Sequence, residues 1–199
     1  MKTLVFCTRN RHKVKEVNAI AGSVFRFMTL DEAGYSHDIP EPYETLEENA
    51  FTKARQVQLE TGFSCFSEDS GLFVDALGGE PGVRSARYAG ENSNVEDNIQ
   101  KLLQGLSACS NRSATFRTVV CLLIDDQVYY FSGECHGKIT HEVQGSGGFG
   151  YDPVFIPDGD HRSFAEMSPE EKNRFSHRKK AIRLLIDFLM NYENPHTIS

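Results

Sequence analysis

The sequence lacks the features that mark membrane, secreted and disulfide-stabilised proteins. No apolar run approaches the length of a membrane span. The segment from Met1 to Phe6 is too short an apolar stretch for a secretion signal, so we expect a cytoplasmic protein. The five cysteines are odd in number and include no Cys-x-x-Cys pair, which argues against a disulfide framework and a cysteine zinc site. Cys7, Cys65 and Cys121 lie among apolar residues and are predicted to be buried, reduced thiols.

Positive charge is also in short supply. The 21 Lys and Arg residues face 28 Asp and Glu residues, which gives a net charge of −7. Such a protein repels polyanions, so no nucleic acid partner is expected. The sequence has no repeat, low-complexity tract or linker, and a 39% hydrophobic content is ordinary for a globular protein. We therefore expect a single domain over residues 1–199.

The positive charge that is present concentrates first between a predicted strand and a predicted helix. Residues 2–7 are apolar enough for a strand, and Val14, Val17 and Ile20 recur at helical spacing. A strand, loop and helix in this order place backbone N–H groups and a helix N-terminus against an anion. The loop is therefore predicted to bind an anion, and its residues are Thr8, Arg9, Asn10, Arg11, His12 and Lys13.

A second helix is predicted to begin at Thr45, because Thr45 followed by Glu48 is the capping-box signature. Asn49 and Lys53 fall inside its apolar stripe rather than on the far side. A lysine in that position either extends to the edge of the core or points into a polar site. Both interpretations of Lys53 are open at this point.

The most informative segment carries two adjacent carboxylates. Residues 63–66 are predicted to form a short buried strand, so that Glu68 and Asp69 emerge together at its end, where α/β sheets bind ligands. Adjacent carboxylates repel unless a cation holds them, which suggests a hard divalent metal such as Mg2+. A solvated acidic turn is the alternative, and it is the commoner explanation of an isolated Glu-Asp pair.

The second half of the chain alternates strand and loop signals. Residues 114–124 and 127–135 predict a β-hairpin that turns at Asp125 and Asp126 and continues through 137–143. The glycine-dense loop that follows lets backbone approach a ligand, and Phe149 and Tyr151 offer flat surfaces on which a base can stack. A plain glycine-rich connection is the alternative.

The C-terminal region predicts two helices and a second basic cluster. Ser168, Pro169 and Glu171 are the N-cap, N1 and N3 residues of a helix start, and the cluster runs from Lys172 to Lys180. The last helix is predicted to begin at Ser176. Its core face is predicted to consist of Ala181, Leu184, Leu185, Phe188 and Leu189.

These features together suggest a metal-dependent enzyme that acts on a phosphorylated, aromatic small molecule. Several motifs then occur in order over nearly the whole chain. They are Thr8-x-Asn10-x-x-Lys13-x-x-Glu16, Glu48-Asn-Ala-x-x-Lys-Ala54, Glu68-Asp-Ser-Gly-Leu72, Ala76-Leu-Gly-Gly-x-Pro-Gly82, Ser85-Ala-Arg-Tyr-Ala-Gly90, Gly147-Gly-Phe-Gly-Tyr-Asp-Pro153, Phe164-Ala-Glu-Met167, Glu171-Lys-Asn173 and Ser176-His-Arg178. In this combination the chain closely resembles the inosine triphosphate pyrophosphatase family.

The resemblance implies an α/β fold with an elongated mixed central β-sheet flanked by helices, two lobes around a cleft, and usually a homodimer. It also implies hydrolysis of the deaminated purine nucleotides ITP, dITP and XTP to the monophosphate and pyrophosphate with Mg2+. This house-cleaning activity keeps deaminated purines out of DNA and RNA. Position 9 departs from the family in carrying Arg where Gly is most common, which adds a candidate phosphate contact. Arg84 stands where an aromatic residue is common.

The resemblance also implies roles for single residues. Asp69 is the catalytic carboxylate that activates water and helps to hold Mg2+, with Glu68 as its helper. The second metal carboxylate falls on Glu41, with Glu44 as the alternative. The residues that would grip the triphosphate are Thr8, Asn10, Lys13, Lys53 and Ser70. Phe149 would stack on the purine. The residues that would address the purine edge and the ribose phosphate are Gly150, Tyr151, Asp152, Lys172, His177 and Arg178.

Two alternative functions would require different residues in these motifs. A regulatory nucleotide-binding module would have lost the acid at 69 or the lysines, and both are present. An enzyme for modified pyrimidine or methylated triphosphates would differ in the base pocket, and His177 and Arg178 argue against it.

Overall fold

The computed structural model describes residues 4–21, 25 and 27–192, and it divides into two compact units. Unit 1 consists of the chain up to Asp69, residues Thr118–Gly133 and the chain from Arg178 onward. Unit 2 consists of Ser70–Arg117 and Glu134–His177. Each unit is therefore assembled from segments that are far apart in the sequence. The expectation of a single domain stays a prediction.

A seven-stranded sheet is the centre of the fold, with the strand order β2-β1-β3-β5-β6-β7 and with β4 paired to β3. β1 runs parallel to both β2 and β3, whereas β4 is antiparallel to β3 and β7 is antiparallel to β6. The sheet is thus mixed, as predicted. The strands are β1 (Leu4–Phe6), β2 (Phe27–Met28), β3 (Cys65–Val74), β4 (Pro81–Gly82), β5 (Ser113–Ile124), β6 (Gln127–Ile139) and β7 (Phe155–Pro157).

Helices cover both faces of the strands. They are α1 (Arg11–Ala21), α2 (Leu46–Thr61), α3 (Val95–Gly105), α4 (Pro169–Phe175) and α5 (His177–Tyr192). The predicted helix starts are confirmed, since the Thr45 side chain accepts from the Glu48 N–H and Ser168 forms a capping box with Glu171. Within the described part of the chain, none of the helices has the length and apolarity needed to cross a membrane.

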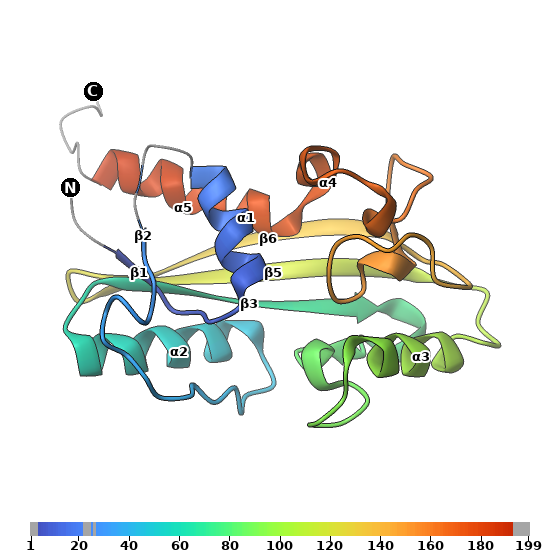
Figure 1. Ribbon diagram of the computed structural model, residues 1–199, viewed down its shortest axis with the longest axis horizontal. Helices are drawn as coiled ribbons and strands as arrows, with labels where there is room; N and C mark the ends of the chain where they lie inside the picture. Colours follow the sequence, from blue (N-terminus) through green and yellow to red (C-terminus); the bar gives the residue numbers. More distant parts are fainter. Residues whose placement is uncertain (1–3, 22–24, 26, 193–199) are drawn as a thin grey trace. The chain divides into compact units, whose positions relative to one another are not determined.

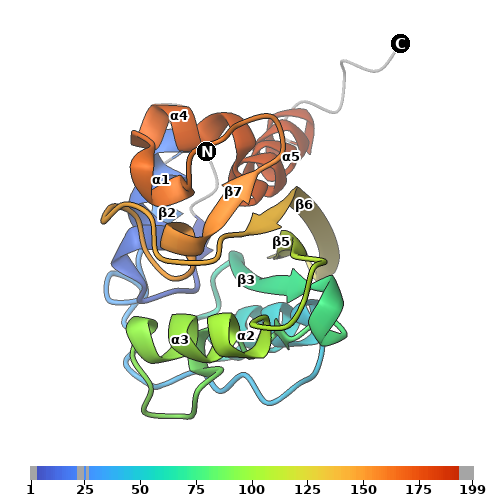
Figure 2. The same cartoon turned by 90° about the vertical axis from the view of Figure 1, so that its right-hand side faces the viewer.

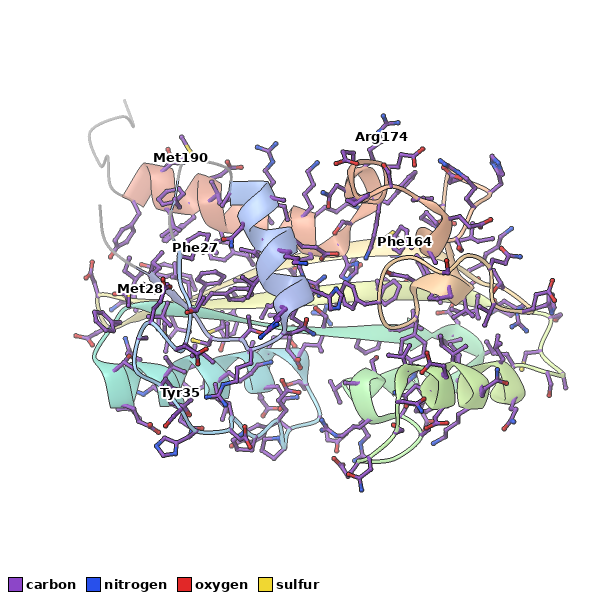
Figure 3. The ribbon with its side chains drawn as sticks, in the orientation of Figure 1. Phe27, Met28, Tyr35, Phe164, Arg174 and Met190 are labelled. Atoms are coloured by element: carbon purple, nitrogen blue, oxygen red, sulfur yellow. The ribbon has the colours of Figure 1, made fainter. Side chains whose placement is uncertain are left out.

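Unit 1 has a hydrophobic core on each face of its strands. On one face, α1 and α5 pack against β1, β3 and β5; on the other, α2 packs against the same three strands (Figures 1 and 2). Phe27 and Tyr35 belong to these two opposite cores and are labelled in Figure 3. The three cysteines predicted to be buried, Cys7, Cys65 and Cys121, are buried and free in the α2-side core.

The predicted core face of α5 needs one correction. Ala181, Leu185 and Leu189 are buried as expected, but Leu184 is 50% exposed. The helix instead buries Ile182 and Ile186, which lie beside these three positions on a 3.6-residue repeat. Leu184 fits the same spacing rule at the margin of the stripe, and the sequence pattern does not reveal where the stripe ends.

Unit 2 has a core of its own. Residues of α3 pack on Leu72 and Val74 of β3 and on the end of β6, together with an aromatic cluster around Phe116, Phe155 and Phe164. Phe164 is labelled in Figure 3. This cluster forms the support for the glycine-rich loop and for α4, which carry the second group of predicted site residues.

The strand that carries the two carboxylates is longer than predicted. The expected strand 63–66 ends before Glu68, but β3 runs from Cys65 to Val74 and contains both carboxylates in its middle. Phe63 lies outside the strand and is 40% exposed. The physical reason is that basic side chains from distant segments neutralise the carboxylates, so that the strand can continue through two acidic residues. The hydrophobic periodicity of a sequence contains no information about ionic partners from distant segments.

The other strand predictions are largely confirmed. The hairpin turns at Asp125 and Asp126, which both adopt left-handed backbone angles (φ 48° and 61°) of the type that tight hairpins require. β6 continues through the predicted second segment only as far as Ile139. Of the first predicted strand, residues 4–6 form β1, while residues 2 and 3 lie outside the described part of the chain.

Candidate active site

The predicted triphosphate and metal residues lie where the order of strands in the sheet reverses. β1 lies between β2 and β3, so the chain leaves β1 for one neighbour and later returns beside it on the other side. β1 ends at Phe6, which pairs with Phe66, so Ser67, Glu68 and Asp69 extend past its carboxyl end. In α/β sheets, ligands bind outside the strand ends at such a reversal point.

The buried Glu68 carboxylate contacts two cations. Arg178 donates from Nε to both carboxylate oxygens, at 3.0 and 2.8 Å, and Lys13 Nζ lies 3.0 Å from Oε1. Arg178 also donates to Glu16 of α1. Burial opposes ionisation, but the two cations outweigh it and lower the pKa of Glu68 to about 2. Glu68 therefore stays ionised and ties β3 to the first turn of α5 and to α1.

Asp69 differs from its neighbour. Its side chain is buried, Oδ1 accepts from Lys53 Nζ at 3.2 Å, and Oδ2 has no hydrogen-bond partner among the described residues. Burial raises the pKa of Asp69; Lys53 opposes this shift, and the Glu41 carboxylate adds to it. Two adjacent carboxyl groups thus have pKa values displaced in opposite directions, which is the pattern of acids with separate chemical tasks.

Lys53 points into this polar site, which resolves the two interpretations of its place in the helix stripe. Its ammonium group donates to Glu41 Oε1 at 2.5 Å, to the Glu68 carbonyl at 2.8 Å and to Asp69 Oδ1 at 3.2 Å. Burial would lower the pKa of Lys53, but Asp69 and Glu41 outweigh burial and raise it. The lysine therefore stays charged although it is only 5% exposed.

The loop predicted to bind an anion forms the entry to α1. The helix begins at Arg11, earlier than the periodicity suggests, and Asn10 Oδ1 accepts from the N–H groups of His12 and Lys13 at 3.0 and 3.3 Å. Thr8 Oγ1 accepts from the Asn10 N–H. The first turn contains no acidic residue, so basic side chains lie at the positive end of the helix dipole. That arrangement is unfavourable by itself, and a bound anion would compensate for it.

Arg9 is held away from this turn by a neighbouring segment. Its guanidinium donates to the Tyr35 carbonyl at 3.1 Å and to Asp38 at 3.4 Å. Among the described non-glycine residues, a positive φ occurs only at Asp125 and Asp126, so the arginine adopts an ordinary backbone conformation where glycine is common in the family. Its role as a phosphate contact stays a prediction.

Two of the carboxylates expected to hold Mg2+ lie close to each other. Across the described residues, no group of three His, Cys, Asp or Glu side chains could hold a metal ion by itself. Glu41 and Asp69 do approach the same ammonium group, and one oxygen of Asp69 has no hydrogen-bond partner in the described part of the chain. This set fits Mg2+, which is commonly bound by one or two carboxylates together with substrate phosphates. The shared contact favours Glu41 over Glu44.

A second cluster of predicted site residues lies in unit 2. Asp152 Oδ2 accepts from the Phe149 N–H at 2.8 Å and from Lys172 Nζ at 2.8 Å, and the Lys172 ammonium lies 4.6 Å from the centre of the Phe149 ring. Asp152 and Lys172 are buried, whereas Phe149 is half-buried. Asp152 thus fixes both the backbone of the aromatic residue and the cation that lies against its ring.

The other predicted base-contacting residues have different surroundings. The Tyr151 ring lies in the core of unit 2, where its hydroxyl donates to the Ser85 carbonyl at 2.9 Å, so it offers no free stacking surface, contrary to the expectation. Burial raises its pKa above the usual range. The buried His177 ring stacks on Phe116 at 4.8 Å. Gly150 adopts a positive φ of 59°.

The second basic cluster does not form one surface. Lys172 is buried against Asp152, and Arg178 is buried against Glu68, while Arg174 is exposed and projects outward from α4 (Figure 3). Ser70 follows Asp69 in β3 and is half-buried. The basic residues that are neighbours in the sequence therefore contact different partners in the structure.

One residue of this region was not anticipated as part of the site. Glu16 shares Arg178 with Glu68 and lies one turn beyond Lys13 on α1. The sequence feature that could have indicated Glu16 is its three-residue spacing from Lys13, which places both residues on the same face of a helix. The acidic residue was visible in the sequence, but its cationic partner lies at the far end of the chain.

The model of the Ham1 family matches residues 4–188. The chain belongs to the Ham1 family. Among curated relatives, dITP/XTP pyrophosphatase of Porphyromonas gingivalis is 49% identical over 96% of this chain and 98% of its own length. The protein of the same name from Flavobacterium psychrophilum is 45% identical over 94% of this chain and 99% of its own length.

Solved structures agree with this assignment. The Ham1 protein of Staphylococcus aureus superimposes with a TM-score of 0.88 at 36% identity, covering 96% of this chain and all (100%) of the other. A Ham1 protein of Coxiella burnetii superimposes with a TM-score of 0.89 at 36% identity, over 96% of this chain and 100% of its own. The resemblance seen in the sequence motifs is thereby confirmed, as is the α/β fold with a central mixed sheet.

Proposed function

We propose that this Ham1-family chain is a nucleoside triphosphate pyrophosphatase that hydrolyses ITP, dITP and XTP to the monophosphate and pyrophosphate. The relatives that match nearly its full length are named dITP/XTP pyrophosphatases. The observation that carries the proposal is the buried Asp69, which lies beside a charged lysine and has one oxygen without a hydrogen-bond partner among the residues that the structure describes. The activity would act on the cytoplasmic nucleotide pool, the location that the sequence predicts.

In this proposal Asp69 orients the attacking water and accepts its proton. The water oxygen forms a bond to the α-phosphorus, the bond from that phosphorus to the bridging oxygen breaks, and pyrophosphate leaves. A carboxyl group whose pKa is raised toward the operating pH is a more effective base than an ordinary one. Glu68 is already surrounded by Arg178 and Lys13, so it supports Asp69 by positioning these cations rather than by exchanging a proton.

The triphosphate would contact the basic side chains of unit 1. Lys13 and Lys53 are charged and lie against the two carboxylates of β3, and Thr8 and Asn10 lie at the start of α1. Phosphate oxygens would be acceptors for the two ammonium groups, and the charge that develops on the leaving pyrophosphate would be stabilised by them. Arg11, His12 and Arg9 would add positive charge, and Ser70 a hydroxyl.

Mg2+ is the proposed cofactor, with Asp69 and Glu41 as its protein ligands. When bound, it would neutralise phosphate charge and polarise the phosphorus toward attack. The protein's own contribution would be two carboxylates, Asp69 on β3 and Glu41 ahead of α2.

The base would be recognised by unit 2 residues. Phe149 would stack on the purine. Asp152 and Lys172 would hold the Phe149 ring in place. The segment 150–152 and His177 would address the purine edge and the ribose phosphate. N–H donors in this pocket would donate to the oxygen at position 6 of deaminated purines. With adenine the same donors would face an amino group, which is also a donor, and would be left unpaired. A homodimer is the assembly expected from the resemblance.

A product assay tests the proposal. The protein is incubated with Mg2+ and ITP, dITP, XTP, GTP, ATP or UTP in turn, and pyrophosphate and orthophosphate are measured separately. We expect pyrophosphate as the primary product and the highest kcat/KM for the three deaminated purine nucleotides. Orthophosphate as the primary product, or equal kcat/KM for ATP and ITP, would refute it.

A further inference from the structure

The Lys53 ammonium group occupies the position between the two proposed metal carboxylates. An ammonium group has three hydrogens, and here they have three acceptors: Glu41 Oε1 at 2.5 Å, the Glu68 carbonyl at 2.8 Å and Asp69 Oδ1 at 3.2 Å. The lysine is therefore fully hydrogen-bonded by the protein itself, at a site where its side chain is only 7% exposed.

Charge balance at this position disfavours a second cation. Glu41, Asp69 and Lys53 together carry a net charge of about −1 when the carboxylates are ionised. A divalent ion on the same carboxylates would bring the local charge to about +1 and would place two cations against the same pair of carboxyl groups. The repulsion would be strong because Lys53 and Asp69 are both buried and poorly screened by solvent.

A triphosphate changes both conditions. Its oxygens are alternative acceptors for the Lys53 hydrogens, so the ammonium can give up Glu41 without leaving a hydrogen unpaired. Its negative charge offsets the added cation. The bond from Lys53 to the Glu68 carbonyl is to backbone, so it can persist while the carboxylate contacts are exchanged.

We propose that Lys53 acts as a resident cation that excludes divalent metal from Glu41 and Asp69 until nucleotide binds. Metal and nucleotide then bind with strong positive coupling, and the empty enzyme holds its two carboxylates in place without metal. This inference rests on the proposed function in one respect, because it takes a nucleoside triphosphate as the ligand that displaces the lysine contacts. Asp69 Oδ2, which accepts no hydrogen bond from the described residues, is the oxygen available for the incoming ion.

Direct metal binding tests the inference without turnover. Free Mn2+ is measured by electron paramagnetic resonance during titration of the wild-type protein, with and without the α,β-methylene analogue of ITP, which resists cleavage at the proposed bond. We expect Mn2+ to bind at least tenfold more tightly with the analogue present. The variant Lys53→Met keeps a chain of similar length and removes the charge, and it should bind Mn2+ without nucleotide at least tenfold more tightly than wild type.

Matched variants distinguish the effect of the Lys53 charge from the effect of its side-chain shape. Lys53→Arg keeps the positive charge and should retain the weak Mn2+ binding of the nucleotide-free wild type. A double variant, Glu41→Gln with Lys53→Met, should not show the tighter Mn2+ binding of Lys53→Met, because the Glu41 carboxylate that Lys53 contacts is then absent. Circular dichroism and thermal melting establish that each variant is folded. Should Lys53→Met fail to fold, the wild-type titration with and without the analogue decides the question.

Two results would overturn the inference. One is nucleotide-free wild type that binds Mn2+ as tightly as in the presence of the analogue. The other is a folded Lys53→Met variant that binds Mn2+ no more tightly than wild type. Neither depends on the product assay. Coupled Mn2+ and analogue binding without pyrophosphate release would refute the proposed function alone, whereas pyrophosphate release without the coupling would refute this inference alone.

Discussion

Arg178 Nε donates to both carboxylate oxygens of Glu68, at 3.0 and 2.8 Å, although 110 positions in the chain separate the two residues. Both side chains are almost completely buried. The pair connects the middle of β3 with the first turn of α5, and Lys13 and Glu16 extend it to α1. One buried group of charges therefore connects two helices, α1 and α5, to the proposed catalytic strand β3.

Removing one charge of this group should destabilise the fold. We expect Glu68→Gln to lower the free energy of unfolding by about 3–5 kcal/mol, because breaking a buried ion pair leaves its partner uncompensated. Urea unfolding followed by circular dichroism measures the change. Glu91→Gln is the control: its exposed carboxylate makes a 3.4 Å contact with Arg87 and should contribute less than about 1 kcal/mol. Equal losses in the two variants would contradict the assigned role of Glu68.

The same carboxylate predicts a pH dependence of stability. The pKa of Glu68 is lowered from 4.5 to about 2 in the folded state, so its stabilising contribution is complete above about pH 4.5 and is lost as the pH falls toward 2. Such a shift corresponds to about 3 kcal/mol. Wild type should therefore lose more unfolding free energy than Glu68→Gln between pH 5 and about 2. Parallel pH profiles of the two proteins would show that Glu68 does not carry this dependence.

The register of α5 can be tested with two adjacent leucines. Leu185 is fully buried and Leu184 is 50% exposed. Leu185→Ala should lower the free energy of unfolding by about 2–5 kcal/mol because it opens a cavity in the core. Leu184→Ala should change it by about 1 kcal/mol or less. Thermal or urea unfolding of the two variants makes the comparison, and a larger loss at position 184 would mean that the helix faces the sheet differently.

Gly148 is predicted to control the placement of Phe149. It adopts a φ of +74°, and a Cβ there would come within 2.1 Å of Asp152 Oδ2, the atom that holds the Phe149 N–H and Lys172. Gly148→Ala should raise the KM for ITP at least about tenfold, because base stacking is worth about 1–3 kcal/mol. Gly34→Ala is the matched control, since Gly34 has a φ of +75° and open space around its Cβ position.

Gly34→Ala should lower stability by about 1–2 kcal/mol, the cost of the left-handed conformation, and leave the KM for ITP unchanged. Steady-state kinetics and thermal melting are measured on both variants. A normal KM in a folded Gly148→Ala protein would show that the Asp152 contacts do not set the position of the aromatic ring.

Local sequence signals predicted many elements of the fold. Thr45 and Ser168 cap helices as their spacing to Glu48 and Glu171 indicated, and the turn at Asp125 follows from its place between two β-rich runs. Each of these features is decided within a few neighbouring residues. Sequence reasoning is strongest where the physical cause is that local.

Features decided by distant partners were predicted less well. Glu68 was expected at a strand end, because nothing near it in the sequence shows that Arg178 neutralises it inside β3. Tyr151 was expected to offer a stacking surface, but its hydroxyl reaches the carbonyl of Ser85 and its ring enters the core. Lys53 was an intermediate case. Its place in a buried stripe left open whether it extends to the edge of the core or points into a polar site, and its hydrogen-bond partners decide this.

The measurement that tests the central claim most directly compares Asp69→Asn with wild type on ITP and Mg2+. Pyrophosphate release gives turnover, and equilibrium dialysis with the cleavage-resistant ITP analogue gives affinity. Asp75→Asn makes the same chemical change at an exposed position just after β3 and is the control. We predict that Asp69→Asn lowers kcat by a factor on the order of 1,000 or more while the analogue still binds, and that Asp75→Asn behaves as wild type. Near-normal pyrophosphate release by Asp69→Asn would contradict the account.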